Sequence, residues 1–177
     1  DESGCADWQI GNANMLVLRA AKQAVDAADG STVRRALMLA NVYGGALLRG
    51  DHFRSLVAVC GELVPLLESF SGELDLRQLK LAQARGLRMC GNRKEACRLF
   101  ESLVTTLKST SERSSAYLNL ALGYRSQKME NEAVDAAREC MKIEPKSPDA
   151  LQAKAIVITI ASDAGEERDA KLRAAEL

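Results

Sequence analysis

One histidine is the first residue to consider for chemistry. His52 follows Asp51 directly, and an imidazole beside a carboxylate can act as a general base. A nucleophilic mechanism would also need a Ser or Cys in a recognisable motif, and none accompanies this pair. The sequence likewise lacks G-x-G-x-x-G, P-loop, H-E-x-x-H and EF-hand patterns. We therefore expect a structural or solvent-exposed role for His52, and we predict a chain that is not an enzyme and binds no cofactor.

Cysteines are the other reactive residues. A disulfide framework or a zinc site needs paired or clustered cysteines, but this chain has an odd number and no C-x-x-C spacing. Most of them lie in apolar helical stripes, where Cys behaves as a small hydrophobe. We predict core thiols, no metal site and a reducing, cytoplasmic location, with a processed or secreted fragment as the alternative because the chain begins with Asp1. The five are Cys5, Cys60, Cys90, Cys97 and Cys140.

Composition excludes several classes of partner. The chain has 177 residues, of which 47% are hydrophobic and 27% charged, as in a globular protein. Lys+Arg and Asp+Glu both number 24, so no net field favours nucleic acid or an anionic membrane. Aromatic residues are 4% of the chain, too few to suggest a base-stacking surface. The longest apolar stretch near the C-terminus, residues 155–161, is too short to cross a bilayer. We predict neither nucleic-acid binding nor membrane insertion.

Helical signals extend along the chain and must position any binding residues. We expect residues 1–11 to form a flexible tail and residues 12–177 to form a single domain. Caps, turns and apolar spacing predict about nine helices in that domain. They cover about residues 12–28, 32–49, 52–64, 75–90, 93–107, 113–127, 130–143, 148–162 and 165–176.

Four local signals refine these boundaries. Ser31 or Thr32 is expected to cap the second helix, and Pro65 to kink or break the third near residues 62–65. Ser147 is expected to cap a helix whose first residue is Pro148. The β-branched run 156–160 would suggest a strand in isolation. We predict helix there, because the chain offers no credible second strand to pair with it.

An internal repeat is the strongest pattern in the sequence. Residues 114–147 contain an aromatic, a Leu-small pair, a second aromatic, a small residue and a closing proline. These residues are Tyr117, Leu120, Ala121, Tyr124, Ala133 and Pro145. Their spacing closely resembles a tetratricopeptide repeat. The small residues Ala121 and Ala133 allow the two helices of the unit to approach closely.

The resemblance weakens outside this unit but covers about residues 36–177. Gly91, Ala96 and Phe100 supply a turn glycine, a small residue and an aromatic in the preceding unit. Gly50 lies 41 residues before Gly91 and resembles another intra-repeat turn, whereas Lys128 stands where the family usually has glycine. Because the spacing is uneven, the alternative is a looser relative of the tetratricopeptide repeat, such as the longer helical-pair repeats of bacterial regulatory sensor domains. Pro145 and the neutral charge disfavour the RNA-binding pentatricopeptide repeats.

The resemblance implies a right-handed α-solenoid of antiparallel helix pairs, with a concave surface lined by the first helix of each pair. Transferring the family's lining positions to this chain gives two sets of residues. The first is Gln78, Leu81, Arg85, Arg88 and Met89, and the second is Ser115, Leu118, Leu122, Arg125 and Ser126. Asn119 matches one position of the clamp with which some family members bind chaperone C-termini. The lysines of that clamp are absent, so we do not expect that function.

These residues suggest a groove that combines arginines with apolar pockets. Such a groove would suit a peptide or helix with acidic and apolar residues. The alternative is that Arg88 and Arg125 only offset the dipoles at two helix C-termini. We predict a non-catalytic scaffold that binds a partner protein. A ligand-sensing regulatory domain of a larger signalling protein or transcription regulator is the alternative function.

Overall fold

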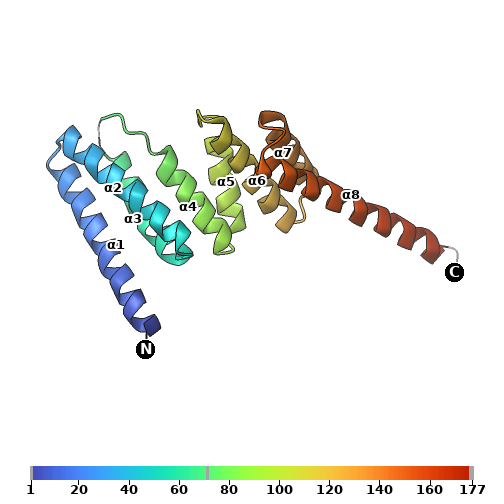
Figure 1. The fold of residues 1–177 in the computed structure, drawn as a ribbon, viewed down its shortest axis with the longest axis horizontal. Coiled ribbons are helices and arrows are strands. Elements are labelled where there is room, and N and C mark those ends of the chain that lie inside the picture. The colour runs from blue at the N-terminus through green and yellow to red at the C-terminus, as the bar shows by residue number, and fades with distance from the viewer. Residues whose placement is uncertain (1, 71, 176–177) are drawn as a thin grey trace. The chain divides into compact units, whose positions relative to one another are not determined.

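The computed structural model describes the backbone of residues 2–70 and 72–175, and the side chains of residues 9–70 and 72–165. The described backbone forms helices and contains no strand, which confirms the all-α prediction (Figure 1). The helices are α1 (Glu2–Asp26), α2 (Gly30–Arg49), α3 (Phe53–Glu68), α4 (Arg77–Met89), α5 (Arg93–Val104), α6 (Thr110–Ser126), α7 (Glu130–Ile143) and α8 (Pro148–Ala175).

The described part of the chain has eight helices, so the expected count of about nine is wrong. The difference lies in α8, which continues from Pro148 to Ala175 across the expected break between residues 162 and 165. Gly165 alone does not end the helix: a mid-helix glycine costs only about 1 kcal/mol relative to alanine, and no proline follows it. The β-branched run 156–160 lies inside α8, as predicted.

Two other boundaries differ from expectation. Helix α1 begins at Glu2 and so includes residues 2–11, for which the sequence predicts a flexible tail. Helix α3 continues through Pro65 to Glu68, so the expected break there is wrong. Pro65 lies in the last turn of α3 and removes a single intrahelical hydrogen bond, the one to the carbonyl of Gly61. The helix continues for three more residues, to Glu68, despite this loss.

The N-terminal cap of α8 agrees with expectation, whereas that of α2 differs. Ser147 caps α8, since its Oγ accepts a hydrogen bond from the N–H of Ala150 at 3.1 Å. Asp29, rather than Ser31 or Thr32, caps α2: its carboxylate accepts hydrogen bonds from the backbone N–H groups of both residues. Hydrogen bonds from the side chains of Thr32 and then Ser31 hold the pKa of Asp29 well below its usual value.

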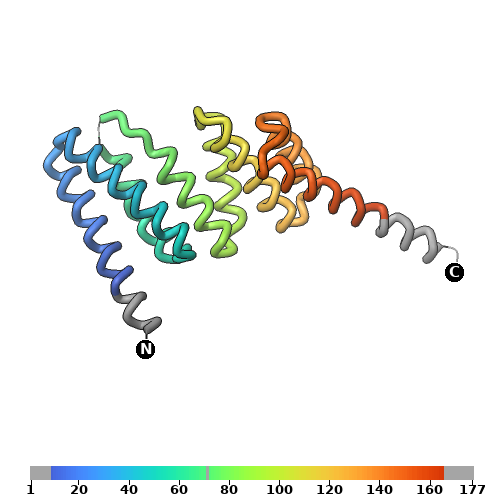
Figure 2. Tube along the Cα trace, viewed as in Figure 1, coloured from blue at the N-terminus to red at the C-terminus, as the bar shows by residue number. Residues whose placement is uncertain are grey.

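The chain groups into two compact units, residues 1–99 and residues 100–177, and α5 contains the boundary. The single domain expected over residues 12–177 stays a prediction. In the first unit α1, α2 and α3 run side by side, and α4 packs against α2 and α3 (Figure 2). Their buried faces form one apolar core. It includes Val17, Ala21, Ala24, Val33, Leu37, Ala40, Leu47, Leu56, Val59, Cys60, Leu63, Leu67 and Leu79.

Leu56 of α3 lies in this core between two glycines of neighbouring helices. A Cβ atom added to Gly44 of α2 would lie 3.5 Å from Leu56 Cδ1. One added to Gly86 of α4 would lie 3.1 Å from Leu56 Cδ2 and 3.1 Å from Val57 Cγ2. The leucine is fully buried, and both glycines are buried as well. The absence of side chains at Gly44 and Gly86 therefore lets α2 and α4 approach the same residue of α3.

Three helix–helix turns share one backbone geometry. In each, the N–H three residues after the last helical residue donates to a carbonyl five residues earlier: His52 to Leu47 at 2.9 Å, Asn92 to Leu87 at 2.9 Å, and Met129 to Tyr124 at 3.0 Å. The residue before each donor has positive φ: 58° at Asp51, 85° at Gly91 and 61° at Lys128. This is the Schellman motif that ends many helices.

The common turn geometry fixes which residues are equivalent between the repeats. Asp51, rather than Gly50, is the counterpart of Gly91, because Gly50 has φ of −90°. The equivalent positions are therefore 40 residues apart from Asp51 to Gly91, and 37 residues apart from Gly91 to Lys128. Lys128 adopts the conformation that the glycine of the tetratricopeptide pattern would adopt.

These turns give a direct test of backbone strain. A non-glycine residue in the left-handed region costs about 1–2 kcal/mol. We expect Lys128→Gly to raise the free energy of unfolding by about 1 kcal/mol, and Gly91→Ala to lower it by about 1 kcal/mol, in urea unfolding monitored by circular dichroism. The matched control is Lys154→Gly inside α8, which should lower stability. A loss of stability in Lys128→Gly would contradict the argument.

In the second unit α6, α7 and α8 pack against one another. Ala121 of α6 and Ala133 of α7 are fully buried, as close approach of these two helices requires. Cys140 of α7 is also fully buried, with its Sγ 3.3 Å from the hydroxyl of Ser114. The hydroxyl of Tyr124 donates a hydrogen bond to the carboxylate of Glu101. The residues of the repeat pattern thus hold the helices of this unit together.

Candidate functional site

The lining residues expected from the sequence lie on two helices. Helix α4, in the first unit, contains Gln78, Leu81, Arg85, Arg88 and Met89. Helix α6, in the second unit, contains Ser115, Leu118, Asn119, Leu122 and Arg125. Leu81 and Leu118 are 2% and 5% exposed, so they have almost no surface to offer a partner. Asn119 is also buried, and its amide donates to the carbonyl of Ser115 at 2.7 Å.

Three of the remaining residues of the α4 set, together with Ala82, form a partly exposed strip. Gln78, Ala82, Arg85 and Met89 recur at helical spacing; Met89 is 49% exposed and Arg85 is half-buried. Arg88 lies off this strip and is also half-buried. Burial, followed by the charge of Arg85, lowers the pKa of Arg88, so the two guanidinium groups are close enough to interact.

On α6 the expected residues are less concentrated. Ser115 and Leu122 are half-buried, and Arg125 and Ser126 are exposed. Arg88 and Arg125 both lie in the last turns of their helices, where a cation offsets the helix dipole.

Helix α2 contributes a face that the sequence analysis missed. The turn equivalence of 40 residues aligns Met38 with Gln78, Val42 with Ala82, Gly45 with Arg85 and Arg49 with Met89. Met38 and Val42 are 68% and 69% exposed, and Leu39 beside them is 47% exposed. Met38 is therefore exposed at the position equivalent to Gln78 of the expected lining, and Val42 is exposed at the position equivalent to Ala82.

Arginines flank this apolar group at both ends of the helix. Arg34, Met38, Val42, Gly45 and Arg49 follow one another at spacings of three or four residues, so they share one face of α2. Arg34 and Arg49 are exposed. Asn41, one residue before Val42, has an amide oxygen that is buried and has no hydrogen-bond partner among the described residues.

The α2 and α4 strips lie on neighbouring helices. A Cβ atom on Gly44, next to Gly45 of the α2 strip, would lie 3.9 Å from Cβ of Ala82 in the α4 strip. We call the exposed members of the two strips, together with the half-buried Arg85, the α2–α4 face. It consists of Arg34, Met38, Val42 and Arg49 of α2, and Gln78, Arg85 and Met89 of α4.

The charge of these two helices is one-sided. Helices α2 and α4 together contain seven Arg or Lys residues and no Asp or Glu, although the chain as a whole has no net charge. Arg77 pairs with Asp75 from the segment between α3 and α4, and Lys80 pairs with Glu68 at the end of α3. The absence of acids from both helices is the signal in the sequence that could have identified α2.

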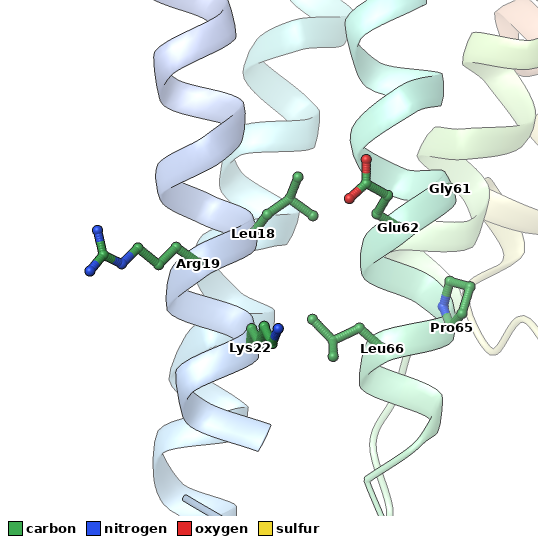
Figure 3. A pocket seen from close by; sticks show the side chains of 7 residues that line it. All are labelled: Leu18, Arg19, Lys22, Gly61, Glu62, Pro65 and Leu66. Carbon is green, nitrogen blue, oxygen red and sulfur yellow. The ribbon is translucent and has the colours of Figure 1, made fainter. Parts of the chain in front are cut away.

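A second feature is a cavity of about 550 Å³ between α1 and α3 (Figure 3). Leu18 of α1 and Leu66 of α3 project into the space between the two helices, and both are half-buried. Lys22 lies on the α1 wall and Glu62 on the α3 wall, whereas the side chain of Arg19 points away from α3. The lining is completed by Gly61 and Pro65.

The residues first considered for chemistry lie elsewhere. His52 and Asp51 are exposed, and both line a small hollow of about 390 Å³ beside the end of α4. Burial raises the pKa of the Cys60 thiol to about 12 and also raises that of Cys140, so both thiols are protonated at neutral pH. Cys97 is buried as well, but Cys90 is exposed, so the core-thiol prediction is wrong for Cys90. The side chain of Cys5 lies outside the described residues.

Among the described residues, no group of three or more His, Cys, Asp or Glu side chains is placed to hold a metal ion. None of the helices in the described part of the chain has the length and apolar character needed to span a bilayer. Comparisons of the chain with protein-family models, with curated proteins and with solved structures find no match. The resemblance to tetratricopeptide repeats therefore stays a prediction from the sequence.

Proposed function

We propose that this chain is a non-catalytic interaction module whose α2–α4 face binds an amphipathic helix of a partner protein. The partner helix would carry apolar residues at its centre and acidic residues toward both ends. The observation that supports this proposal is the combination of exposed Met38 and Val42 with flanking arginines, on two helices that contain no acid.

The apolar part of the face supplies affinity. Met38 and Val42 lie one helical turn apart and are mostly exposed, and Met89 of α4 adds a third apolar side chain. Burying exposed apolar area stabilises a complex by about 25 cal/mol per Å² before the costs of association are subtracted. Methionine side chains are flexible and polarizable, so they adapt to the shape of a partner. The face therefore suits the apolar stripe of a helix.

The charged part of the face selects the partner. Arg34 and Arg49 are 15 residues apart on α2, which corresponds to about 22 Å along the helix axis. A partner helix lying along α2 would need acids separated by about four turns to pair with both arginines. Arg85 on α4 adds a cation beside the middle of the face. Guanidinium groups bind carboxylates through paired hydrogen bonds, so acidic partners are favoured over basic ones.

A designed peptide tests this proposal. The probe is a labelled 18-residue helix with Leu at positions that form one stripe and Glu at both ends, and its matched control carries Lys in place of Glu. We expect saturable binding of the acidic peptide alone in fluorescence anisotropy, weakening as salt is added. Met38→Ala with Val42→Ala, and separately Arg34→Glu with Arg49→Glu, should each weaken binding at least about tenfold.

The control pair is Arg93→Glu with Arg98→Glu, two exposed arginines of α5 outside the face. This pair has the same change in net charge and should leave the affinity nearly unchanged. Equal binding of the acidic and basic peptides would contradict the proposal. So would equal weakening by the two charge-reversed pairs, because the effect would then come from net charge rather than from the face.

A further inference from the structure

The cavity between α1 and α3 combines an apolar surface with opposite charges on its two walls. Leu18 and Leu66 project toward each other's helix (Figure 3), and Pro65 also lines the cavity. Lys22 and Glu62 both line the cavity, the cation on α1 and the anion on α3. The volume of about 550 Å³ lies in the range of small-molecule sites.

The backbone adds an acceptor to the anionic wall. Pro65 has no N–H, so the carbonyl of Gly61 loses the hydrogen bond that a regular helix would give it. Gly61 lines the cavity with backbone atoms alone, since it has no side chain. Glu62 follows it directly. Because Gly61 and Glu62 are adjacent and both line the cavity, we expect this carbonyl and the carboxylate to act together as acceptors for an ammonium group.

The two charges of the cavity do not neutralise each other. Within the described residues, neither Lys22 nor Glu62 forms an ion pair, whereas Glu68 on the same helix pairs with Lys80 at 2.5 Å. Both Lys22 and Glu62 are exposed at their walls. Each is thus available to a ligand that carries the complementary charge.

We propose that this cavity binds a small zwitterion with an apolar side chain. The ligand's carboxylate pairs with Lys22, its ammonium group pairs with Glu62 and donates to the Gly61 carbonyl, and its apolar side chain packs on Leu18 and Leu66. Free apolar amino acids and short apolar peptides share this chemistry. The site lies on α1 and α3 and uses no residue of the α2–α4 face, so it is independent of the proposed partner binding.

Calorimetric titration with two probes tests the site and distinguishes a free amino acid from a short peptide as the ligand. The probes are leucine and the dipeptide Leu-Leu, each compared with its N-acetylated and C-amidated forms. We expect saturable binding of at least one zwitterionic probe, and at least tenfold weaker binding of both blocked forms. Binding of leucine identifies the amino acid as the ligand class, whereas binding of Leu-Leu alone identifies the short peptide.

Variants test which charged group of the ligand each of the two residues binds. Glu62→Gln should weaken the zwitterion at least tenfold but leave the weak binding of the acetylated probe unchanged, because that probe has no ammonium group. Lys22→Gln should likewise weaken the zwitterion at least tenfold. It should leave the weak binding of the amidated probe unchanged, because that probe has no carboxylate. The matched controls, Glu73→Gln and Lys94→Gln, alter exposed residues outside the cavity and should change nothing.

Pro65→Ala tests the carbonyl separately. The new N–H of residue 65 would donate to Gly61 and withdraw that acceptor from the ligand, so affinity should fall several-fold while thermal stability rises. The proposal is overturned if neither zwitterion binds at concentrations up to about 10 mM, or if binding is the same in Glu62→Gln and Lys22→Gln as in the unaltered chain. Peptide capture by the α2–α4 face should be unaffected by all of these variants.

Discussion

Replacing Leu56 with Ala should lower the free energy of unfolding by about 3–4 kcal/mol, one of the largest effects expected from a single substitution in the first unit. Leu56 is fully buried, and its two methyl groups contact the glycine positions of α2 and α4. Its removal would leave a cavity that α2, α3 and α4 all border, and close packing on three sides limits how far they can collapse into it. Urea unfolding monitored by circular dichroism gives the value directly.

A double-mutant cycle shows whether Leu56 and Gly86 are coupled. Gly86→Ala alone should cost about 1–2 kcal/mol, because its Cβ would meet Leu56 and Val57 at 3.1 Å. In the Leu56→Ala background the same change should cost about 1–2 kcal/mol less, since only the contact with Val57 remains and alanine is a better helix former than glycine. The interaction energy from the cycle should therefore be about 1–2 kcal/mol.

The matched control for Gly86 is Gly61→Ala in α3. Nothing lies within 4 Å of a Cβ atom built at Gly61, so alanine should raise stability there by about 0.5–1 kcal/mol. Additive effects of Leu56→Ala and Gly86→Ala would contradict the packing argument. A loss at Gly61 as large as that at Gly86 would show that helix position, and not contact with Leu56, determines the cost.

The second large effect is expected at Pro65. Pro65→Ala should raise the free energy of unfolding by about 2 kcal/mol. The substitution restores an N–H donor for the Gly61 carbonyl and removes the ring that crowds this carbonyl, which together are worth about 3 kcal/mol in a mid-helix position and less in the last turn, where Pro65 lies. The greater freedom of alanine in the unfolded chain offsets part of this gain, by about 0.4–1 kcal/mol.

Pro148→Ala is the matched control for this prediction. Pro148 is the first residue of α8, where a missing N–H removes no intrahelical bond, so alanine should change stability little or lower it slightly. Chemical unfolding of both variants under the same conditions separates the two cases. If Pro65→Ala left stability unchanged or reduced it, the proline would have a stabilising packing role in the wall of the cavity.

The sequence predicted those features that depend on local chemistry. The turns at Gly91 and Lys128, the cap at Ser147 and the helical state of residues 156–160 follow from a few neighbouring residues each. Errors arose where a weak local signal competed with the rest of a helix. A single glycine at position 165 cannot end a helix without a capping turn, and Pro65 falls so near the end of α3 that it removes one bond.

The candidate site was less predictable because exposure is set by tertiary packing. Helix α2 has more apolar residues than one stripe can bury: Val33, Leu37 and Leu47 enter the core, whereas Met38 and Val42 do not. Spacing alone does not say which of two apolar faces the neighbouring helices will cover. The same limit explains Leu81 and Leu118, which match lining positions of the resemblance yet are buried.

The separation of charge in the first unit has a kinetic consequence. A molecule whose positive and negative charges balance exerts little force at long range, yet two adjacent acid-free helices create a local positive field near their surface. That field acts within about 8–10 Å at physiological ionic strength, and so affects the final approach more than the initial diffusion. An acidic molecule would be oriented as it approaches, and its association rate constant would fall with added salt. Its diffusion at longer distances would not be directed toward the protein.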